Sequence, residues 1–289
     1  MSKENNVLLK VEDLSISFKQ DNKEIPTIKN VNLYINEGES ISIVGESGSG
    51  KTVTCRSMLG LVPRPPAVYT GGHIHFKGKD LVNMTEKDWR EVRGQEISMV
   101  FQDPMTALNP VFTIGQQMEN VYLYQGKRST YSKLRKSKSD LKKEARERSL
   151  YLLEKMHLPD PEGMLKRYPF ELSGGQRQRI IIALAMIHTP RLLICDEPAT
   201  ALDVTVQSSI NNELVRLVKE EGISMIYITH NLGVAKEVSD RTYVMQLGEV
   251  VEEGPTDKVL LNPQHPYTKQ LLDALPRVTG KKKHEEVVL

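Results

Sequence analysis

The sequence predicts an α/β fold, in which a parallel sheet carries a phosphate-binding loop beside an antiparallel β subdomain and an inserted helical subdomain. Three observations predict this fold. The Gly/Ser-rich stretch GESGSGKT (45–52) follows an apolar strand pattern and precedes a helix pattern. A second short apolar run, RLLICDEP (191–198), contains two consecutive carboxylates. The long stretch between them carries helical patterns such as LKKEARERSLYLLEKMHL, while alternating patterns before residue 100 predict the antiparallel strands.

The composition is that of an ordinary globular protein. The chain has 289 residues, of which 39% are hydrophobic and 26% charged. Its 39 basic and 37 acidic residues give a net charge of +2, which argues against a nucleic-acid-binding protein. Two distant cysteines, Cys55 and Cys195, indicate neither a disulfide framework nor a zinc site. The longest clean apolar run, IIIALAMI, falls short of the roughly twenty residues that cross a bilayer, so we expect a soluble chain.

The stretch 45–52 matches the phosphate-binding pattern G-x-x-x-x-G-K-[ST]. Glycines let backbone N–H groups curl around a phosphate, and the following helix directs its positive end at the same anion. Lys51 would reach the β- and γ-phosphates of a nucleoside triphosphate, and the Thr52 hydroxyl would bind Mg²⁺. A chance Gly/Ser-rich turn is the alternative, but it does not explain the flanking strand and helix patterns. The nucleotide-binding residues predicted here are Gly45, Glu46, Ser47, Gly48, Ser49, Gly50, Lys51 and Thr52.

The run 191–198 predicts a buried parallel strand with two acids at its carboxyl end, where α/β proteins bind ligands. Asp196 would hold Mg²⁺, directly or through water. Glu197 would orient and deprotonate the attacking water. The alternative is that both acids merely cap a strand, and the phosphate-binding loop in the same chain weakens it.

A second phosphate-binding element is predicted at LSGGQRQR (172–179), where a hydroxyl and backbone amides precede the helix pattern IIIALAMIH. Its nucleotide-binding residues are Ser173, Gly174, Gly175 and Gln176. One nucleotide needs only one such loop. We therefore expect the second element to serve a nucleotide that another subunit binds.

These motifs, in this order, resemble the ATP-binding subunit of an ABC transporter over nearly the whole chain, with LSGGQ as the family's signature motif. The resemblance implies further roles. Gln102 in MVFQDP would bind nucleotide and Mg²⁺ and act in catalysis, and Asp203 in TALD would lie at the nucleotide of the dimer. The resemblance also makes His230 in YITHN a catalytic residue that hydrogen-bonds the γ-phosphate and the water. Phe18 in SISFK would stack on adenine.

Three stretches resemble the oligopeptide/dipeptide importer group, which also includes nickel importers. They are FQDPMTALNPVFTIGQQ (101–117), NPQHPYTKQLLDALP (262–276) and PRPPAVYTGGHIHFKGKDL (63–81), the last favouring a D-type subunit. The resemblance implies Mg-ATP as the bound species and a head-to-tail dimer, with an F-type cassette or a second copy. It also implies two membrane-spanning permease subunits, an indirect link to a substrate-binding protein, and a place on the cytoplasmic face of the membrane. Whether the cargo is a peptide, nickel or another small solute stays open, since other subunits select it.

Two other functions are weighed against this one. A soluble ABC protein of DNA repair or translation usually has two cassettes or a DNA-binding insert, and this chain shows one cassette and balanced charge. A non-catalytic regulatory cassette would lack catalytic residues, whereas Glu197 is present. ATP turnover, followed by co-purification with a membrane subunit, would separate the three.

We expect a cassette over 1–250, with the helical subdomain inserted at roughly 105–178, and a C-terminal extension over 251–289. D-type subunits often bind an iron–sulfur cluster through tail cysteines, but the tail TGKKKHEEVVL has none, so no cluster is expected. The basic segment 126–149 is either a solvated loop leading into a surface helix or a contact for anionic lipid. His73 and His75 alternate on one strand with no expected acidic partner, so they predict no metal site.

Overall fold

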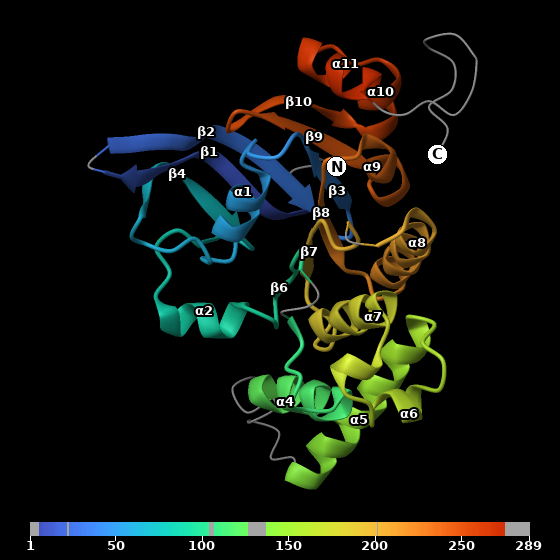
Figure 1. Ribbon diagram of the computed structural model, residues 1–289. Coiled ribbons are helices and arrows are strands. Elements are labelled where there is room, and N and C mark those ends of the chain that lie inside the picture. Colours follow the sequence, from blue (N-terminus) through green and yellow to red (C-terminus); the bar gives the residue numbers. More distant parts are fainter. Residues whose placement is uncertain (1–5, 22, 104–106, 127–136, 201, 275–289) are drawn as a thin grey trace, which may run out of the picture. The chain divides into compact units, whose positions relative to one another are not determined.

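Two units make up the protein, whose computed structural model describes residues 6–21, 23–103, 107–126, 137–200 and 202–274. The first unit lies within Met1–Trp89 and Ser224–Leu289, and the second within Arg90–Ile223. Figure 1 labels their helices and strands.

An antiparallel sheet in the first unit has the strand order β2-β1-β4-β5. Apolar residues alternate along its strands and bury one face, as the sequence pattern predicts. The strands are β1 (Val7–Gln20), β2 (Lys23–Asn36), β4 (Ala67–Phe76) and β5 (Lys79–Asp80).

The expectation that His73 and His75 lack acidic partners is wrong. His73 Nδ1 lies 3.0 Å from Asp80 Oδ2, and His75 Nε2 lies 3.4 Å from Glu12 Oε2. Strand β4 pairs with β5 on one side and with β1 on the other, and this pairing supplies both acids.

The same unit also contains four strands in the order β10-β9-β3-β8. Strand β3 runs parallel to both of its neighbours, and all its residues are buried. Two of them are serines, and the buried Ser42 hydroxyl pairs with the Thr242 hydroxyl of β9 at 2.7 Å. The strands are β3 (Ser40–Val44), β8 (Ser224–Thr229), β9 (Arg241–Gln246) and β10 (Glu249–Pro255).

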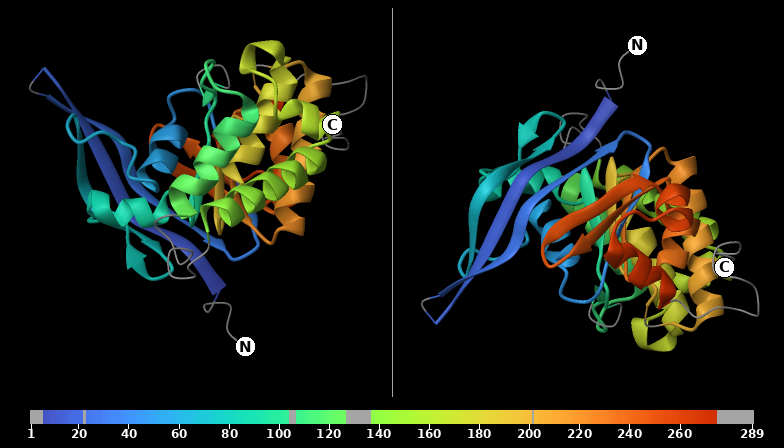
Figure 2. Two further views of the ribbon diagram at one scale, coloured as in Figure 1. Left: turned by 90° about the horizontal axis from the view of Figure 1, so that it is seen from below. Right: turned by 90° about the horizontal axis from the view of Figure 1, so that it is seen from above.

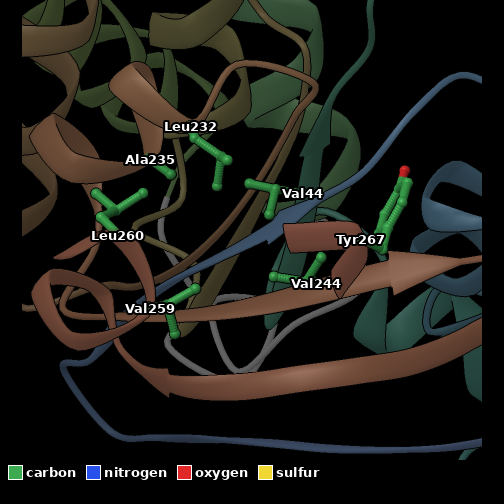
Figure 3. Close-up of a cluster of buried hydrophobic side chains, with 7 residues drawn as sticks. All are labelled: Val44, Leu232, Ala235, Val244, Val259, Leu260 and Tyr267. Carbon is green, nitrogen blue, oxygen red and sulfur yellow. The ribbon is translucent and has the colours of Figure 1, made fainter. Parts of the chain in front are cut away.

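Helix α1 (Lys51–Ser57) follows β3 and is shorter than the helix that the sequence KTVTCRSMLGLV (51–62) predicts. Gly60, at φ +59°, turns the chain after the helix, and the Leu61 N–H donates back to the Arg56 carbonyl at 2.9 Å. The C-terminal helices of the unit are α9 (Leu232–Val238), α10 (Thr256–Leu261) and α11 (Pro266–Asp273). They share a buried apolar cluster with β3 and β9 (Figure 3).

The second unit contains the parallel strands β6 (Ile97–Val100) and β7 (Leu192–Asp196). Its helices α4 and α5 lie side by side (Figure 2). A capping box at Ser137 begins α5: the Ser137 hydroxyl accepts from the Asp140 N–H, and the Asp140 carboxylate accepts from the Ser137 N–H. The helical elements are α4 (Ile114–Gly126), α5 (Lys138–Lys155), α6 (Pro161–Met164), η3 (Pro169–Glu171), α7 (Gly174–Ala185) and α8 (Val204–Glu220).

One arginine ties three helices of this unit together. Arg148 on α5 donates to both carboxylate oxygens of Glu221, the C-cap of α8, at 3.1 and 3.0 Å. It also donates to the carbonyl of Met186, the C-cap of α7, at 3.1 Å. The guanidinium thus satisfies helix-end carbonyls that would otherwise lack donors.

Helix α2 (Glu86–Val92) connects the sequence of the first unit to that of the second. Within the described residues, no helix is both long and apolar enough to span a bilayer. Helices α4 to α6 fall inside the predicted helical insertion, whose boundaries stay a prediction. Residues 127–136 of the basic segment 126–149 lie outside the described residues, as does the tail from 275.

Candidate nucleotide site

The predicted phosphate-binding loop joins the buried strand β3 to helix α1. Three of its residues have positive φ: Gly45 at 155°, Gly48 at 81° and Gly50 at 100°. At Gly45 the reason is space, because a Cβ there would lie 2.2 Å from the Met245 carbonyl oxygen and 2.8 Å from Ser49 Oγ. At Gly48 the space is open, since a Cβ would meet no atom within 4 Å. The loop therefore needs glycine at position 45 because a side chain would clash, and at position 48 because of the positive φ alone.

Lys51 lies under the loop and is only 6% exposed. Its ammonium group donates to the carbonyls of Gly45 at 2.7 Å and Glu46 at 2.8 Å. The Ser49 hydroxyl is buried and has no hydrogen-bond partner among the described residues. A buried cation beside an unpaired hydroxyl fits an anionic ligand that accepts hydrogen bonds, such as a phosphate.

His230 directly follows strand β8 and is exposed. The residues beside it are held firmly. The Asn231 N–H donates to Thr229 Oγ1 at 3.0 Å, and the Asn231 side chain caps α9 by accepting from the Gly233 N–H at 2.8 Å. This tight turn presents the His230 side chain at the carboxyl end of a parallel strand, where α/β proteins bind ligands.

Phe18 lies on β1, where it pairs with Ile25 of β2 and Ala67 of β4. The residue is half-buried. Its predicted stacking on adenine stays a prediction.

The second unit carries the acidic pair. Asp196 ends β7 and is 2% exposed. Glu197 follows at φ +46°, a left-handed conformation that is uncommon for a residue with a side chain and that concentrates at functional sites. Its Oε2 accepts from the Gln102 amide at 3.2 Å and from the Thr200 hydroxyl at 3.2 Å. The carboxylate is therefore oriented by two donors.

Burial, together with the negative charge of Asp196, raises the pKa of the Cys195 thiol well above its usual range. This cysteine stays a neutral apolar residue in the strand, which agrees with the absence of any predicted chemical role for it.

The signature residues begin helix α7. Ser173 is the N-cap: its hydroxyl accepts from the Gln176 N–H at 3.3 Å, and its own N–H donates to the Gln176 side chain at 3.0 Å. Ser173 and Gly174 are exposed. Asp203 caps α8 in a similar way, accepting from the Val206 N–H at 3.0 Å.

The two helix starts are packed closely. A Cβ on Gly174 would lie 3.2 Å from the Leu202 side chain, and one on Gly175 would lie 3.0 Å from the Val206 side chain. These glycines thus allow α7 to approach the segment that carries Asp203.

The first unit therefore carries Phe18, the loop 45–52 and His230, and the second carries Gln102, Ser173–Gln176, Asp196, Glu197 and Asp203. Direct contact joins Gln102 to Glu197. Two residues that bear on the site were missed. Thr200 holds Glu197, and Tyr267 accepts from the Glu46 N–H at 2.9 Å. The sequence offered one signal for each residue. Thr200 has a hydroxyl three residues after Glu197, and Tyr267 lies in the NPQHPYT motif.

A phosphate-binding loop, a strand-end acid pair and a helix-capping serine define a nucleoside triphosphatase of the P-loop class. The family model described as "ABC transporter" matches residues 28–200, and the model described as "Oligopeptide/dipeptide transporter, C-terminal region" matches residues 251–288.

Among curated proteins, the chain is 45% identical to the oligopeptide transport ATP-binding protein OppD of Bacillus subtilis (strain 168), over 96% of this chain and 74% of that protein. It is 44% identical to the dipeptide transport ATP-binding protein DppD of the same strain, over 94% of this chain and 77% of that protein. Among solved structures it resembles the dimeric ATP-binding cassette MJ0796 bound to ADP and Pi. The TM-score is 0.71 at 28% identity, over 86% of this chain and 98% of that one.

The chain belongs to the ABC transporter family. It is an ATPase whose hydrolysis is coupled to transport, and the fold class and the family resemblance drawn from its sequence are confirmed.

Proposed function

We propose that this chain is the ATP-hydrolysing subunit that powers the import of oligopeptides or dipeptides, working head to tail with a second cassette beneath two membrane-spanning permease subunits. The second cassette is an F-type subunit or another copy, and a substrate-binding protein delivers the cargo. The complex places this chain at the cytoplasmic face of the membrane as a peripheral subunit.

The observation that carries the proposal is the presence of two phosphate-binding elements in one chain. The loop 45–52 supplies a buried lysine, and the exposed N-terminus of α7 supplies Ser173 and backbone amides. One nucleotide needs a single loop, so the second element suits a nucleotide held by an opposing cassette. The dimeric state named for MJ0796 supports the same arrangement.

Within each cassette, Lys51 would neutralise charge on the β- and γ-phosphates. Glu197, oriented by Gln102 and Thr200, would accept a proton from the attacking water. His230 would hydrogen-bond the γ-phosphate and that water. Ser173 of the opposing cassette would close over the nucleotide, and closure followed by reopening would drive the permease subunits.

Mg²⁺ is the ion that these residues would hold, if Thr52 of the first unit and Asp196 and Gln102 of the second act on the same nucleotide. Thr52 offers a hydroxyl, Asp196 a buried carboxylate and Gln102 an amide oxygen, which are the hard oxygen ligands that the ion prefers. When bound, the ion would neutralise the charge that develops on the β/γ-phosphates. Asp196 would then supply a buried negative charge, and Thr52 would supply its hydroxyl oxygen.

The peptide cargo rests on the C-terminal region matched at 251–288 and on the names of OppD and DppD. Uptake of a labelled tripeptide should be measured in cells whose copy of this gene carries Lys51→Ala, with nickel uptake measured in parallel. We expect peptide uptake to fall to background while nickel uptake is unchanged. Loss of nickel uptake alone would instead assign the chain to a metal importer, and loss of neither would reject the transport role.

A further inference from the structure

The C-terminal region forms part of the support of the nucleotide loop. Val259 and Leu260 of α10 and Tyr267 of α11 share one buried cluster with Val44, the last residue of β3 before the loop (Figure 3). The same cluster includes Leu232 and Ala235 of α9, the helix that begins two residues after His230. Residues beyond 250 thus contact the elements that lead to both predicted phosphate ligands.

Tyr267 extends this support into the loop itself. Tyr267 is 5% exposed, and in Figure 3 its hydroxyl points away from the other six side chains of the cluster. The Glu46 N–H donates to that hydroxyl at 2.9 Å. Burial raises the pKa of the Tyr267 phenol, so the hydroxyl stays neutral across the physiological range and can accept this bond.

The peptide group between Gly45 and Glu46 is therefore held from both sides. Its carbonyl, on Gly45, accepts from Lys51 Nζ at 2.7 Å, and its N–H, on Glu46, donates to Tyr267 at 2.9 Å. The carbonyl and N–H of a trans peptide point in opposite directions. A rotation of this peptide plane would break both bonds, so Tyr267 and Lys51 together fix the entry to the loop.

Tyr267 is itself held by the motif in which it lies. His265 caps α11 by accepting from the Tyr267 N–H at 3.2 Å. The Glu252 carboxylate of β10 accepts from the backbone N–H groups of Gln264 at 2.8 Å and His265 at 3.0 Å. The Gln-His-Pro-Tyr sequence (264–267) thus positions one phenol against the nucleotide loop.

We propose that Tyr267 is a positioning residue for nucleotide binding, which acts through the Glu46 backbone and does not touch the nucleotide. This inference rests on the proposed binding of ATP by the loop. With the hydroxyl present, the loop is pre-organised. Without it, the Glu46 N–H loses its partner, and the loop conformation that binds nucleotide becomes less populated. The apparent affinity for Mg-ATP falls in proportion to that population.

The test is Tyr267→Phe, with Tyr243→Phe as the matched control. Tyr243 is also fully buried in the first unit, and its hydroxyl bonds the backbone of Tyr34 at 3.1 Å rather than the loop. Two quantities are measured on the full chain: hydrogen exchange of the Glu46 amide without nucleotide, and the Kd for Mg-ATP. We expect Tyr267→Phe to speed exchange at Glu46 and to weaken binding roughly 2–12-fold, the range of one net hydrogen bond, while Tyr243→Phe changes neither.

Hydrogen exchange at Glu46 tests the positioning role of Tyr267, and the Kd for Mg-ATP also tests the proposed function. If Tyr267→Phe lowers the melting temperature as Tyr243→Phe does, but leaves Glu46 exchange and Mg-ATP affinity at the parent values, the hydroxyl only anchors the C-terminal region and the inference is wrong. If the parent binds no ATP, the proposed function fails, whereas Glu46 exchange still decides the positioning claim. In the parent itself, an unprotected Glu46 amide would contradict the inference without any variant.

Discussion

Gln102 and Glu197 face each other because the strands that precede them pair in register. Val100 of β6 lies opposite Cys195 of β7. Gln102 and Glu197 each come two residues after this pair, and the Gln102 amide donates to the Glu197 carboxylate at 3.2 Å. Thr200 donates to the same oxygen, Oε2. The proposed general base is thus held by a residue that is 95 positions away in the sequence.

Gln102→Ala should lower the maximal ATPase rate by about 10-fold. A positioned general base as a whole contributes roughly 10²–10⁴-fold, and this change removes one of its orienting donors, and one proposed Mg²⁺ ligand, while leaving Thr200 in place. The maximal rate of the purified chain with Mg-ATP checks this. Thr200→Val, which removes the other donor, serves as the comparison, and an unchanged rate in both variants would show that the carboxylate needs neither.

Lys51→Ala should abolish hydrolysis and sharply weaken ATP binding. The change removes the charge that neutralises the phosphates and also the two hydrogen bonds that hold the Gly45 and Glu46 carbonyls. Turnover and nucleotide affinity are measured on protein free of contaminating ATPase. Parent-level turnover in this variant would refute the assignment of the loop.

Gly45→Ala should damage the loop far more than Gly48→Ala. A methyl at Gly45 would clash with the Met245 carbonyl oxygen at 2.2 Å, whereas a methyl at Gly48 meets nothing within 4 Å. Gly48→Ala still places a side chain at positive φ, which costs about 1 kcal/mol. Chemical denaturation and Mg-ATP affinity measure both variants, and equal effects would mean that the loop tolerates the clash by shifting.

Arg148→Ala should destabilise the second unit by about 3 kcal/mol at pH 7, the lower end for breaking a buried pair, since the Arg148 and Glu221 side chains are 19% and 11% exposed. Urea unfolding measures the change. Arg148→Lys, which keeps the charge but not the two-pronged geometry, should lose less. Equal stability of Arg148→Ala and the parent would show that the pair contributes nothing.

The same pair predicts a pH dependence. Burial raises the pKa of Glu221, but the hydrogen bonds and charge of Arg148 outweigh it, so the folded-state pKa lies below its ordinary value of 4.5. The pair therefore stabilises the fold above pH 4.5, and this contribution is lost as the pH falls through the lower folded-state pKa. In Arg148→Ala, the largest influence that lowers the pKa of Glu221 is gone, so this carboxylate should contribute less acid destabilisation than in the parent. The difference in unfolding free energy between the parent and Arg148→Ala should therefore shrink as the pH falls below 4.5. Unfolding curves between pH 3 and 7 would show this, and in a Glu221→Gln background the difference should no longer depend on pH in this range.

Local patterns in the sequence predicted the loop, the buried strands β3 and β7, and the helix that Ser173 caps, because each depends on neighbouring residues. Register between distant strands leaves no local trace. The pairing of Val100 with Cys195 and the Glu12 carboxylate beside His75 could not be predicted for that reason. The acid beside His73 is different, because Asp80 lies only seven residues away, across the turn between β4 and β5. The contact of Tyr267 with Glu46, which joins positions 221 apart, is of the same kind. The roles of the individual site residues stay predictions.

Glu197→Gln should separate ATP binding from ATP hydrolysis. The change removes the proposed base but keeps its size, and it leaves Lys51, Thr52 and Asp196 intact. We predict a fall in ATP turnover of roughly 10²–10⁴-fold with nearly unchanged ATP affinity. Because hydrolysis is blocked, size-exclusion chromatography with light scattering should show a long-lived dimer with Mg-ATP, alone or with the partner cassette, and a monomer without it. A variant that hydrolyses ATP at the parent rate, or that stays monomeric in saturating Mg-ATP with its partner present, would contradict the account.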